Sequence, residues 1–389
     1  MPGPGIRNSS SLPPSAALLL LGSFLATGCH QPIRTAPPSA SYRPGPILVY
    51  VATDSSLRRV SPDRFESQPG FIEAYAISPT TGALGMLSNF YLRGGTEPQA
   101  MIQDPRHRFD YIADVSADTL RAYAVDPQTG RLQPGPVTDL PPVSEAVSIA
   151  LTPNGKFLYV AFQALNAVGA YAVNPDTGSL TAVPGSPFPT TGTGLYGHDV
   201  AVTRDGHFVL ATDLHSVYSF RINPASGALS FVNALAGPIG ILGLAIDPHG
   251  RFAYAAGSGP QAISTYTIQP KTGRLSLLAA MPLNPNDSVG AFALSPDGRF
   301  AYAAQNAGIL VYRLHAGRFS NPLITGPRAH ATTQLAVDPS GRFLLAPQGG
   351  QVNSLCGWSI DPETGLLQPL PGSPYPLPHG QRTILVTSN

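Results

Sequence analysis

The sequence is short of charge. Only 12 % of its 389 residues are Asp, Glu, Lys or Arg, about half the usual share in a globular protein, and the formal net charge is +1. This balance excludes the basic footprint of a nucleic-acid-binding protein. The scarcity of charge indicates strands that are buried on both faces, and the 43 % of hydrophobic residues argues against a disordered chain.

Cysteine is scarce as well. The two cysteines, Cys29 and Cys356, are too few for a disulfide framework or a cysteine-rich zinc site. No Gly-x-Ser-x-Gly, His-Glu-x-x-His, Walker or dinucleotide-binding motif occurs, so a serine-hydrolase elbow, a zincin and a nucleotide enzyme have no support. We therefore expect neither a metal nor a cofactor.

The N-terminal apolar run, residues 16–26, is too short to span a bilayer as a helix. It ends in small residues, which is typical of a secretion signal, so we assign residues 1–28 to a signal peptide. The segment resembles a bacterial lipobox, in which Cys29 would be lipidated; the alternative is an ordinary cleaved signal beside an incidental cysteine. Residues 29–46 are rich in proline and are expected to form a tether. The expected location is the cell envelope, with a lipid anchor, in the periplasm or at the outer membrane of a diderm bacterium.

Proline and glycine are abundant, with 42 and 40 copies, and they mark two alternating motifs. The first recurs at intervals of 43 to 51 residues as DPRHRF (104–109), TPNGKF (152–157), TRDGHF (203–208), DPHGRF (247–252), SPDGRF (295–300) and DPSGRF (338–343). The second reads SPTTG, DPQTG, NPDTG, NPASG, QPKTG and DPETG, with a degenerate HAGR. Both are hairpin turns, because Asp, Asn or Ser bonds the turning backbone, Pro presets φ and Gly closes the turn.

The repeats predict an all-β fold, a seven-bladed β-propeller of four-stranded blades over residues 47–389. The single Trp and the lack of repeated Trp-Asp argue against the WD40 type. Residues 47–52 match the second strand of a unit and residues 382–389 match the first. We therefore expect the C-terminal strand to complete the first blade and leave no open edge.

The repeats resemble the lactonase family of seven-bladed propellers, which includes 6-phosphogluconolactonases and muconate cycloisomerase-like proteins. SPDGRFAYAA (295–304) and VNPDTGSL (173–180) carry this resemblance. It implies a hydrolase of lactones, with its chemistry at the start of the inner strands. Where the family has His-x-His, this chain keeps only His198, and Leu242, Thr333 and Ala291 replace an Arg, an Arg and a Glu. The resemblance thus implies that most of the catalytic Arg and Glu positions are missing.

One residue per blade is expected at the mouth of the central channel, six positions before the turn proline or its equivalent. These residues are Gln99, Val147, His198, Leu242, Gly290, Thr333 and Arg382. A histidine and a carboxylate can move the proton that lactone opening requires, and an arginine can polarise the carbonyl. The candidate catalytic residues are therefore His198, Asp199 and Arg382.

Further polar residues map to the same rim. The candidate ligand-binding residues are Gln99, Glu97, Glu145, Asp287, His330 and His379. For each of them the alternative is an ordinary solvated loop residue, and Arg382 could equally serve the closing strand.

Two functions remain open from the sequence. One is an exported hydrolase of a non-phosphorylated sugar or aromatic lactone, and the other is a non-catalytic propeller that binds a small ligand or a protein on its variable loops. We expect a monomer that binds a lactone or carbohydrate-like ligand, or a protein partner on the loop face. We expect no nucleic acid, and contact with a membrane only through the N-terminal lipid.

Overall fold

A computed structural model describes residues 47–53, 56–61, 64–68, 70–79, 81–87, 92–95, 97–190, 197–258, 262–282, 289–305, 308–320, 322–324, 334–348, 353–377 and 381–388. The predicted signal peptide and the predicted tether lie outside these residues, and so does Cys29. Within them, no helix has the length and apolarity needed to cross a membrane.

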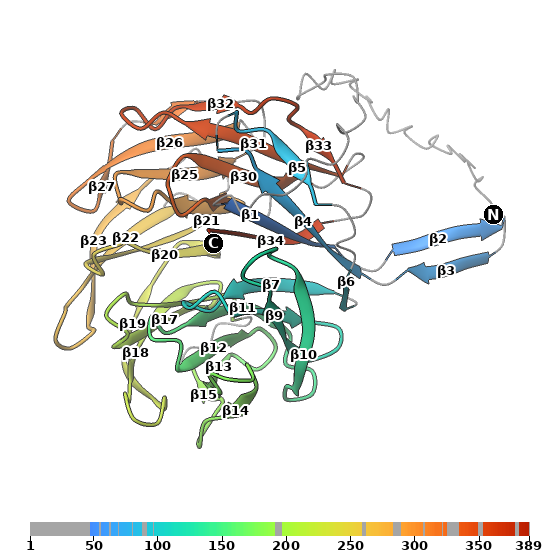
Figure 1. Ribbon diagram of the computed structural model, residues 1–389. Coiled ribbons are helices and arrows are strands. Elements are labelled where there is room, and N and C mark those ends of the chain that lie inside the picture. Colours follow the sequence, from blue (N-terminus) through green and yellow to red (C-terminus); the bar gives the residue numbers. More distant parts are fainter. Residues whose placement is uncertain are drawn as a thin grey trace, which may run out of the picture.

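Seven antiparallel sheets stand around a central axis as the blades of a propeller, which confirms the predicted fold (Figure 1). The first strands of neighbouring blades contact one another in the order β34, β7, β11, β16, β20, β24 and β29, and β29 returns to β34. This ring of inner strands surrounds the channel. The start of every inner strand therefore lies at the same end of the channel.

The strands of each blade, from the inside outward, follow the predicted order. Blades 1 and 2 comprise β34 (Gln381–Ser388), β1 (Ile47–Thr53), β4 (Gly70–Ile77), β5 (Leu84–Met86) and β6 (Leu92–Gly95), then β7 (Pro98–Gln103), β8 (Phe109–Asp114), β9 (Thr119–Val125) and β10 (Leu132–Asp139). Blades 3 and 4 comprise β11 (Ala146–Leu151), β12 (Phe157–Phe162), β13 (Ala167–Val173), β14 (Leu180–Ala182) and β15 (Phe188–Pro189), then β16 (Asp199–Val202), β17 (Phe208–Thr212), β18 (Ser216–Ile222) and β19 (Leu229–Ala236).

Blades 5 to 7 repeat this plan. They comprise β20 (Ile239–Ile246), β21 (Phe252–Ser258), β22 (Ile263–Ile268) and β23 (Leu275–Met281), then β24 (Ala291–Leu294), β25 (Phe300–Gln305), β26 (Gly308–His315), β27 (Arg318–Phe319) and β28 (Leu323–Ile324), and last β29 (Ala336–Val337), β30 (Phe343–Gln348), β31 (Ser354–Ile360), β32 (Leu367–Pro369) and β33 (Tyr375–Pro376). In blades 1, 3, 6 and 7 the outer strand consists of two short pieces that both pair with the third strand. The sequence did not indicate this division.

The ends of the chain close the ring as predicted. β34 pairs with β1 in an antiparallel register that runs from Ile47 opposite Ser388 to Ala52 opposite Thr383. The C-terminal strand β34 is therefore the innermost strand of blade 1, and the N-terminal strand β1 is the second strand of the same blade. This pairing leaves neither strand edge open between the two ends of the chain.

Apolar residues fill the space between adjacent blades. Each of seven buried clusters combines strands of two neighbouring blades; one of them packs Leu120 of blade 2 with Leu158 of blade 3. The second strands β8, β12, β17 and β25 are buried along their whole length. Because both faces of these strands are covered, a charged side chain on them could not reach solvent. This explains the low content of charged residues.

The repeated turns pack each blade against the next. Gly365, in the outer hairpin of blade 7, has φ 75°, and a Cβ there would lie 2.5 Å from Cδ1 of Phe300 in the first turn of blade 6. The same pair recurs as Gly178 with Phe109, Gly227 with Phe157, Gly273 with Phe208, Gly317 with Phe252 and Gly82 with Phe343. Glycine is thus required twice, by its backbone conformation and by the ring that packs against it.

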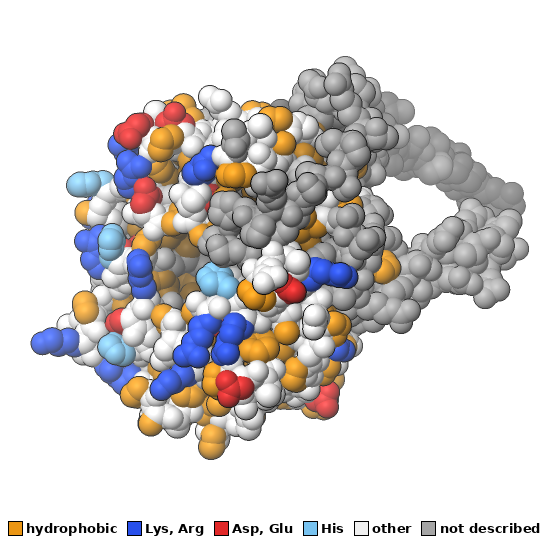
Figure 2. Space-filling view, viewed as in Figure 1, with side chains coloured by type: hydrophobic (Ala, Val, Ile, Leu, Met, Phe, Trp, Pro, Cys, Tyr) orange, Lys and Arg blue, Asp and Glu red, His pale blue; other side chains and the backbone are white. Residues whose placement is uncertain are grey.

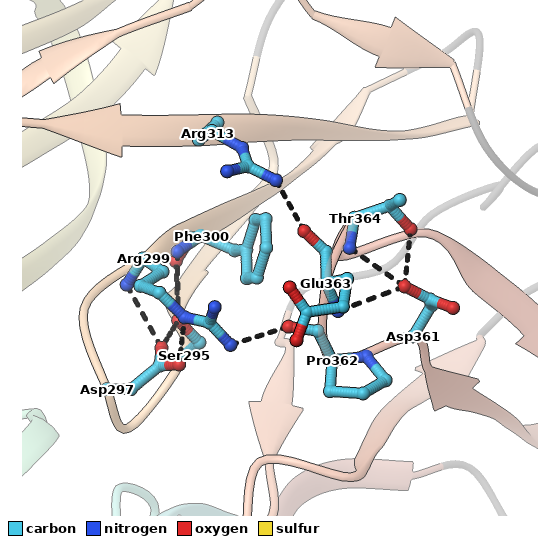
Figure 3. Close-up of polar contacts among 9 residues, drawn as sticks. All are labelled: Ser295, Asp297, Arg299, Phe300, Arg313, Asp361, Pro362, Glu363 and Thr364. Atoms are coloured by element: carbon cyan, nitrogen blue, oxygen red, sulfur yellow. Dashed lines mark hydrogen bonds and ion pairs between the residues drawn. The ribbon is translucent and has the colours of Figure 1, made fainter.

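Arginines reinforce the same junction. Arg299 stacks over Phe300, with 5.4 Å from Cζ to the ring centroid, and its Nη2 donates to the carbonyl oxygen of Pro362 at 2.5 Å (Figure 3). Arg313 also lies over Phe300 and donates to the carbonyl oxygen of Glu363. The guanidinium groups therefore satisfy carbonyls of the next blade while they cover an aromatic ring. We call the end of the molecule that carries these turns the turn face.

The opposite end, which we call the loop face, carries the connections from second to third strands and from each blade to the next. These connections differ from blade to blade. The largest addition is a hairpin of β2 (Ser56–Ser61) and β3 (Arg64–Gln68), which stands away from blade 1 (Figure 1). The sequence predicted a variable loop there but gave no sign of its strands.

Candidate functional site

A cavity of about 630 Å³ occupies the loop-face end of the channel. Six of the seven rim positions counted from the sequence line it, and the seventh, Thr333, lies outside the described residues. The lining rim residues are Gln99, Val147, His198, Leu242, Gly290 and Arg382. The constant offset of six residues from the turn proline or its equivalent therefore leads to the channel mouth in these blades.

The other predicted residues divide into three groups. Asp199 also lines the cavity, whereas Glu97 and Glu145 do not. Glu145 is half-buried behind the rim, where its backbone carbonyl accepts a hydrogen bond from the Gln163 amide at 3.0 Å. Three further predicted residues, Asp287, His330 and His379, lie outside the described residues.

Arg382, on the closing strand β34, forms an ion pair with Glu97, with 3.1 Å between Nη2 and Oε1. Glu97 Oε2 accepts a second hydrogen bond from Ser116 Oγ at 2.6 Å. The side chains of Arg382 and Glu97 are 39 % and 35 % exposed, so the pair contributes little to stability. Its effect on the site is electrostatic, because the carboxylate offsets the arginine charge at the cavity wall.

Asp199 joins three blades. Its Oδ1 accepts hydrogen bonds from Ser148 Oγ at 2.6 Å and from its neighbour's amide at 2.8 Å, and its Oδ2 accepts one from the Leu244 amide at 2.9 Å. Burial raises the pKa of Asp199, while the hydrogen bonds from Ser148 and Leu244 oppose that rise. With both oxygens engaged, this carboxylate is suited to hold its neighbours in place.

His198 sits at the start of β16, beside Asp199. Its amide donates to the carbonyl oxygen of Thr212 at 2.8 Å, and Thr212 Oγ1 accepts from the Asp199 amide at 3.1 Å, so both residues are fixed to the second strand of blade 4. Burial lowers the pKa of His198, and the charge of Asp199 opposes this effect. The imidazole is thereby kept neutral near pH 7, and a neutral imidazole can accept a proton.

Carboxamides are the residues that sequence reasoning missed. Gln163, Gln334 and Asn353 line the cavity together with the predicted Gln99. Gln334 is fixed to the closing strand, since its Oε1 accepts from the Ile384 amide at 2.7 Å and from Thr383 Oγ1 at 3.2 Å. Gln163 directly follows β12 and Asn353 directly precedes β31, so polar residues in the second-to-third strand connections were the available signal.

No described group of three or more His, Cys, Asp or Glu side chains could hold a metal ion. The chemistry that the described site offers is therefore that of one histidine, one arginine in an ion pair, one fixed carboxylate and several carboxamides.

A family model described as "Lactonase, 7-bladed beta-propeller" matches residues 137–241 and 198–379. The chain belongs to this lactonase family. No curated protein matches the sequence of this lactonase-family propeller. Solved structures do match its fold, three of them as follows.

A putative 6-phosphogluconolactonase from Bacteroides uniformis shares 18 % identity with this lactonase-family propeller, over 88 % of this chain and 99 % of that one, with a TM-score of 0.71. The periplasmic gluconolactonase of Pseudomonas aeruginosa shares 20 % identity over 88 % and 99 % of the two chains, with a TM-score of 0.69. A second putative 6-phosphogluconolactonase, from Bacteroides fragilis, shares 20 % over 88 % and 98 %, with a TM-score of 0.68. Similarity at this level establishes the shared fold.

Proposed function

We propose that this lactonase-family propeller hydrolyses an uncharged, hydroxyl-rich lactone in the channel-mouth cavity. The observation that carries the proposal is the composition of the lining, in which His198 stands among the carboxamides Gln99, Gln163, Gln334 and Asn353. A carboxamide both donates and accepts hydrogen bonds, as a hydroxyl group does. Such a lining suits the hydroxyl groups of a sugar.

The charges of the cavity argue against a phosphorylated substrate. Phosphate recognition uses cations whose N–H groups are directed at the anion. The only described cation in the lining is Arg382, and Glu97 already pairs with it. An aromatic lactone is also less well matched, because Phe292 is the one aromatic residue among the described lining residues.

In the proposed reaction, neutral His198 takes a proton from water as the water oxygen adds to the lactone carbonyl. The guanidinium group of Arg382, in the cavity wall, stabilises the negative oxygen that forms. The bond between the carbonyl carbon and the ring oxygen then breaks, and the ring oxygen takes the proton back from His198. The product is the open hydroxy acid, and the histidine returns to its neutral form.

Asp199 serves this reaction as a positioning residue. Its hydrogen bonds to Ser148 and Leu244 tie blades 3, 4 and 5 together directly beside His198. Its negative charge also favours the protonated imidazole that forms during the reaction. Both effects support the histidine without contact between Asp199 and the substrate.

We propose further that the protein acts outside the cytoplasm and is held by a lipid on Cys29. The apolar run 16–26 and the small residues before Cys29 support this location, and one structure of similar fold is a periplasmic gluconolactonase. Wild-type protein is expected in the membrane fraction with an acyl group detectable by mass spectrometry. Cys29→Ala should release it or block its processing. A soluble wild-type protein without an acyl group would show that the cysteine is incidental.

The hydrolase proposal is tested with a panel of lactones on the purified protein. The panel contains neutral aldonolactones, their 6-phosphorylated counterparts and aromatic lactones, and product acid is followed by titration. Turnover of a neutral aldonolactone, with little or none of its phosphorylated counterpart, is the expected result. If the protein binds these compounds but consumes none, it is a non-catalytic propeller and the hydrolase proposal is wrong.

A further inference from the structure

A second pocket lies at the opposite end of the molecule from the proposed catalytic cavity. It has a volume of about 100 Å³ and is formed where the first turn of blade 2 meets the turns of blade 3. Three cations, Arg106, Arg108 and Lys156, line it. Figure 2 shows Lys and Arg side chains gathered over the position of β11 and β12 in Figure 1. In a chain with few charges, this is a local excess of positive charge.

The repeat shows why the excess arises here. In blades 4 and 6, an aspartate in the first turn pairs with the basic residue of that turn: Asp205 with His207 at 3.2 Å, and Asp297 with Arg299 at 2.7 Å. In blade 2 the same position of the turn is Arg106, and in blade 3 it is Asn154. Blades 5 and 7 have His249 and Ser340 at this position, and in blade 5 Arg251 pairs instead with Asp247, at 3.7 Å. The turns of blades 2 and 3 therefore lack the acid that pairs with the turn cation in blades 4 and 6.

Other acids near the pocket do not replace it. Asp104 is itself part of the pocket wall, but it is buried, and its oxygens accept hydrogen bonds from the backbone amides of Arg106, Arg108 and Phe109. Asp176 lies in the facing turn of blade 3 and is exposed. Within the described residues, no ion pair joins either acid to the three cations, so the pocket keeps a positive balance.

Two contacts fix the side chain of Arg108 in this pocket. Its Cζ lies 5.7 Å from the ring centroid of Phe109, and its Nη2 donates to the carbonyl oxygen of Pro175, another residue of the pocket wall. These two contacts fix the guanidinium plane and occupy one of its five N–H donors. A fixed guanidinium loses less freedom when it binds an oxyanion than a mobile one would.

We propose that this pocket binds a phosphate group. The proposal is independent of the lactone chemistry, because the pocket is on the turn face and the catalytic cavity is on the loop face. Three cations around one small pocket suit a dianion better than a single carboxylate. The phosphate could be carried by a soluble compound or by a lipid headgroup, and the two sources share the same chemistry at the protein.

Binding is measured by calorimetry of the intact protein with inorganic phosphate at low ionic strength, because salt screens exposed charges. The test variant is Arg106→Asp, which restores the acid found in blades 4 and 6 and should leave the fold intact. We expect it to weaken phosphate binding at least about tenfold, with its melting temperature unchanged. The control is Arg299→Gln, which removes a turn arginine at the junction of blades 6 and 7 and should bind phosphate normally.

The source of the phosphate is separated by co-sedimentation with vesicles of phosphatidylglycerol and of phosphatidylcholine, with Cys29→Ala as the background of every protein so that no lipid on Cys29 contributes. Sedimentation with the anionic vesicles alone, lost in Arg106→Asp, assigns the pocket to a lipid headgroup. Phosphate binding without sedimentation assigns it to a soluble compound. Wild-type protein that binds neither, or an Arg106→Asp variant that binds as well as wild type, would overturn the proposal.

Discussion

The two ends of the propeller are built on opposite plans. On the turn face the same glycine, phenylalanine and arginine recur from blade to blade and make the same contacts, as Gly365, Phe300 and Arg299 illustrate. On the loop face each blade presents a different residue to the cavity, among them His198, Leu242 and Arg382. The difference indicates that the turn face holds the blades together, while the loop face, where residues vary, is the place of the proposed chemistry.

We expect deletion of the C-terminal strand to have the strongest effect, because it opens the ring of blades. Removing residues 382–389 takes away most of β34, the inner strand of blade 1, and exposes the edge of β1. We expect almost no soluble protein, measured as yield after centrifugation and size-exclusion chromatography.

A deletion on the loop face is the matched comparison. Replacing residues 56–68 by a short glycine turn removes β2 and β3 but keeps β1 paired with β4, since Ala52 already lies opposite Ile72. This variant should remain soluble and folded. Equal losses in the two deletions would contradict the division between the faces.

Asp110 is an exception within the otherwise regular turn end. It follows Phe109, whereas Leu158, Val209 and Ala301 follow the corresponding phenylalanines. Burial raises its pKa to about 7, opposed by the side chain of Gln103 and assisted by the charge of Asp104. The folded state therefore holds this proton more tightly than the unfolded state, and stability should fall as pH rises from about 4 to about 7.

Asp110→Asn removes this titration. The variant should gain stability relative to wild type as pH rises, by an amount on the order of 2–4 kcal/mol at pH 8. Urea unfolding at pH 4.5 and pH 8 measures the difference. A constant difference between the two proteins at both pH values would show that Asp110 does not titrate in this range.

A glycine substitution with a smaller expected effect tests the packing of glycine on phenylalanine between blades. Gly365→Ala places a Cβ against Phe300 at a residue with φ 75°, and we expect a loss of about 1–3 kcal/mol in the free energy of unfolding. Gly85→Ala is the control, because nothing lies within 4 Å of a Cβ at that position. If both variants lose the same stability, the packing of glycine on phenylalanine is not what joins the blades.

We expect a still smaller effect in the pH dependence of kcat/KM, which reports the pKa of His198. Because burial lowers the pKa of His198 from its ordinary value of 6.5, kcat/KM for a neutral lactone should rise with pH through a midpoint below 6.5. Protonated His198 cannot accept the proton from water, so activity is lost on the acid side. A midpoint above 6.5 would mean that the charge of Asp199 outweighs burial.

The sequence predicted the fold well because the turn face is repetitive. Turn prolines and glycines at regular intervals gave the number of blades, and the final strand gave the closure between Ile47 and Ser388. The same count located six residues of the cavity wall. These features depend on backbone geometry, which local motifs specify.

The content of the cavity was harder to predict. Gln334 and Asn353 come from connections without a motif, and the pairing of Arg382 with Glu97 joins residues of neighbouring blades that lie far apart in the sequence. Likewise, nothing in the sequence showed that Asp199 bonds Ser148 and Leu244. Contacts between blades depend on how the side chains of two different repeats point toward each other, and the motif of one repeat does not specify this.

We propose that His198, at the loop face, carries out lactone hydrolysis. The most direct measurement is kcat for a neutral aldonolactone with wild type, His198→Ala and His249→Ala, the last of which changes an exposed histidine of a blade 5 turn. We expect kcat to fall by a factor of about 10²–10⁴ in His198→Ala and to stay at the wild-type value in His249→Ala. Full activity in His198→Ala would contradict the proposal.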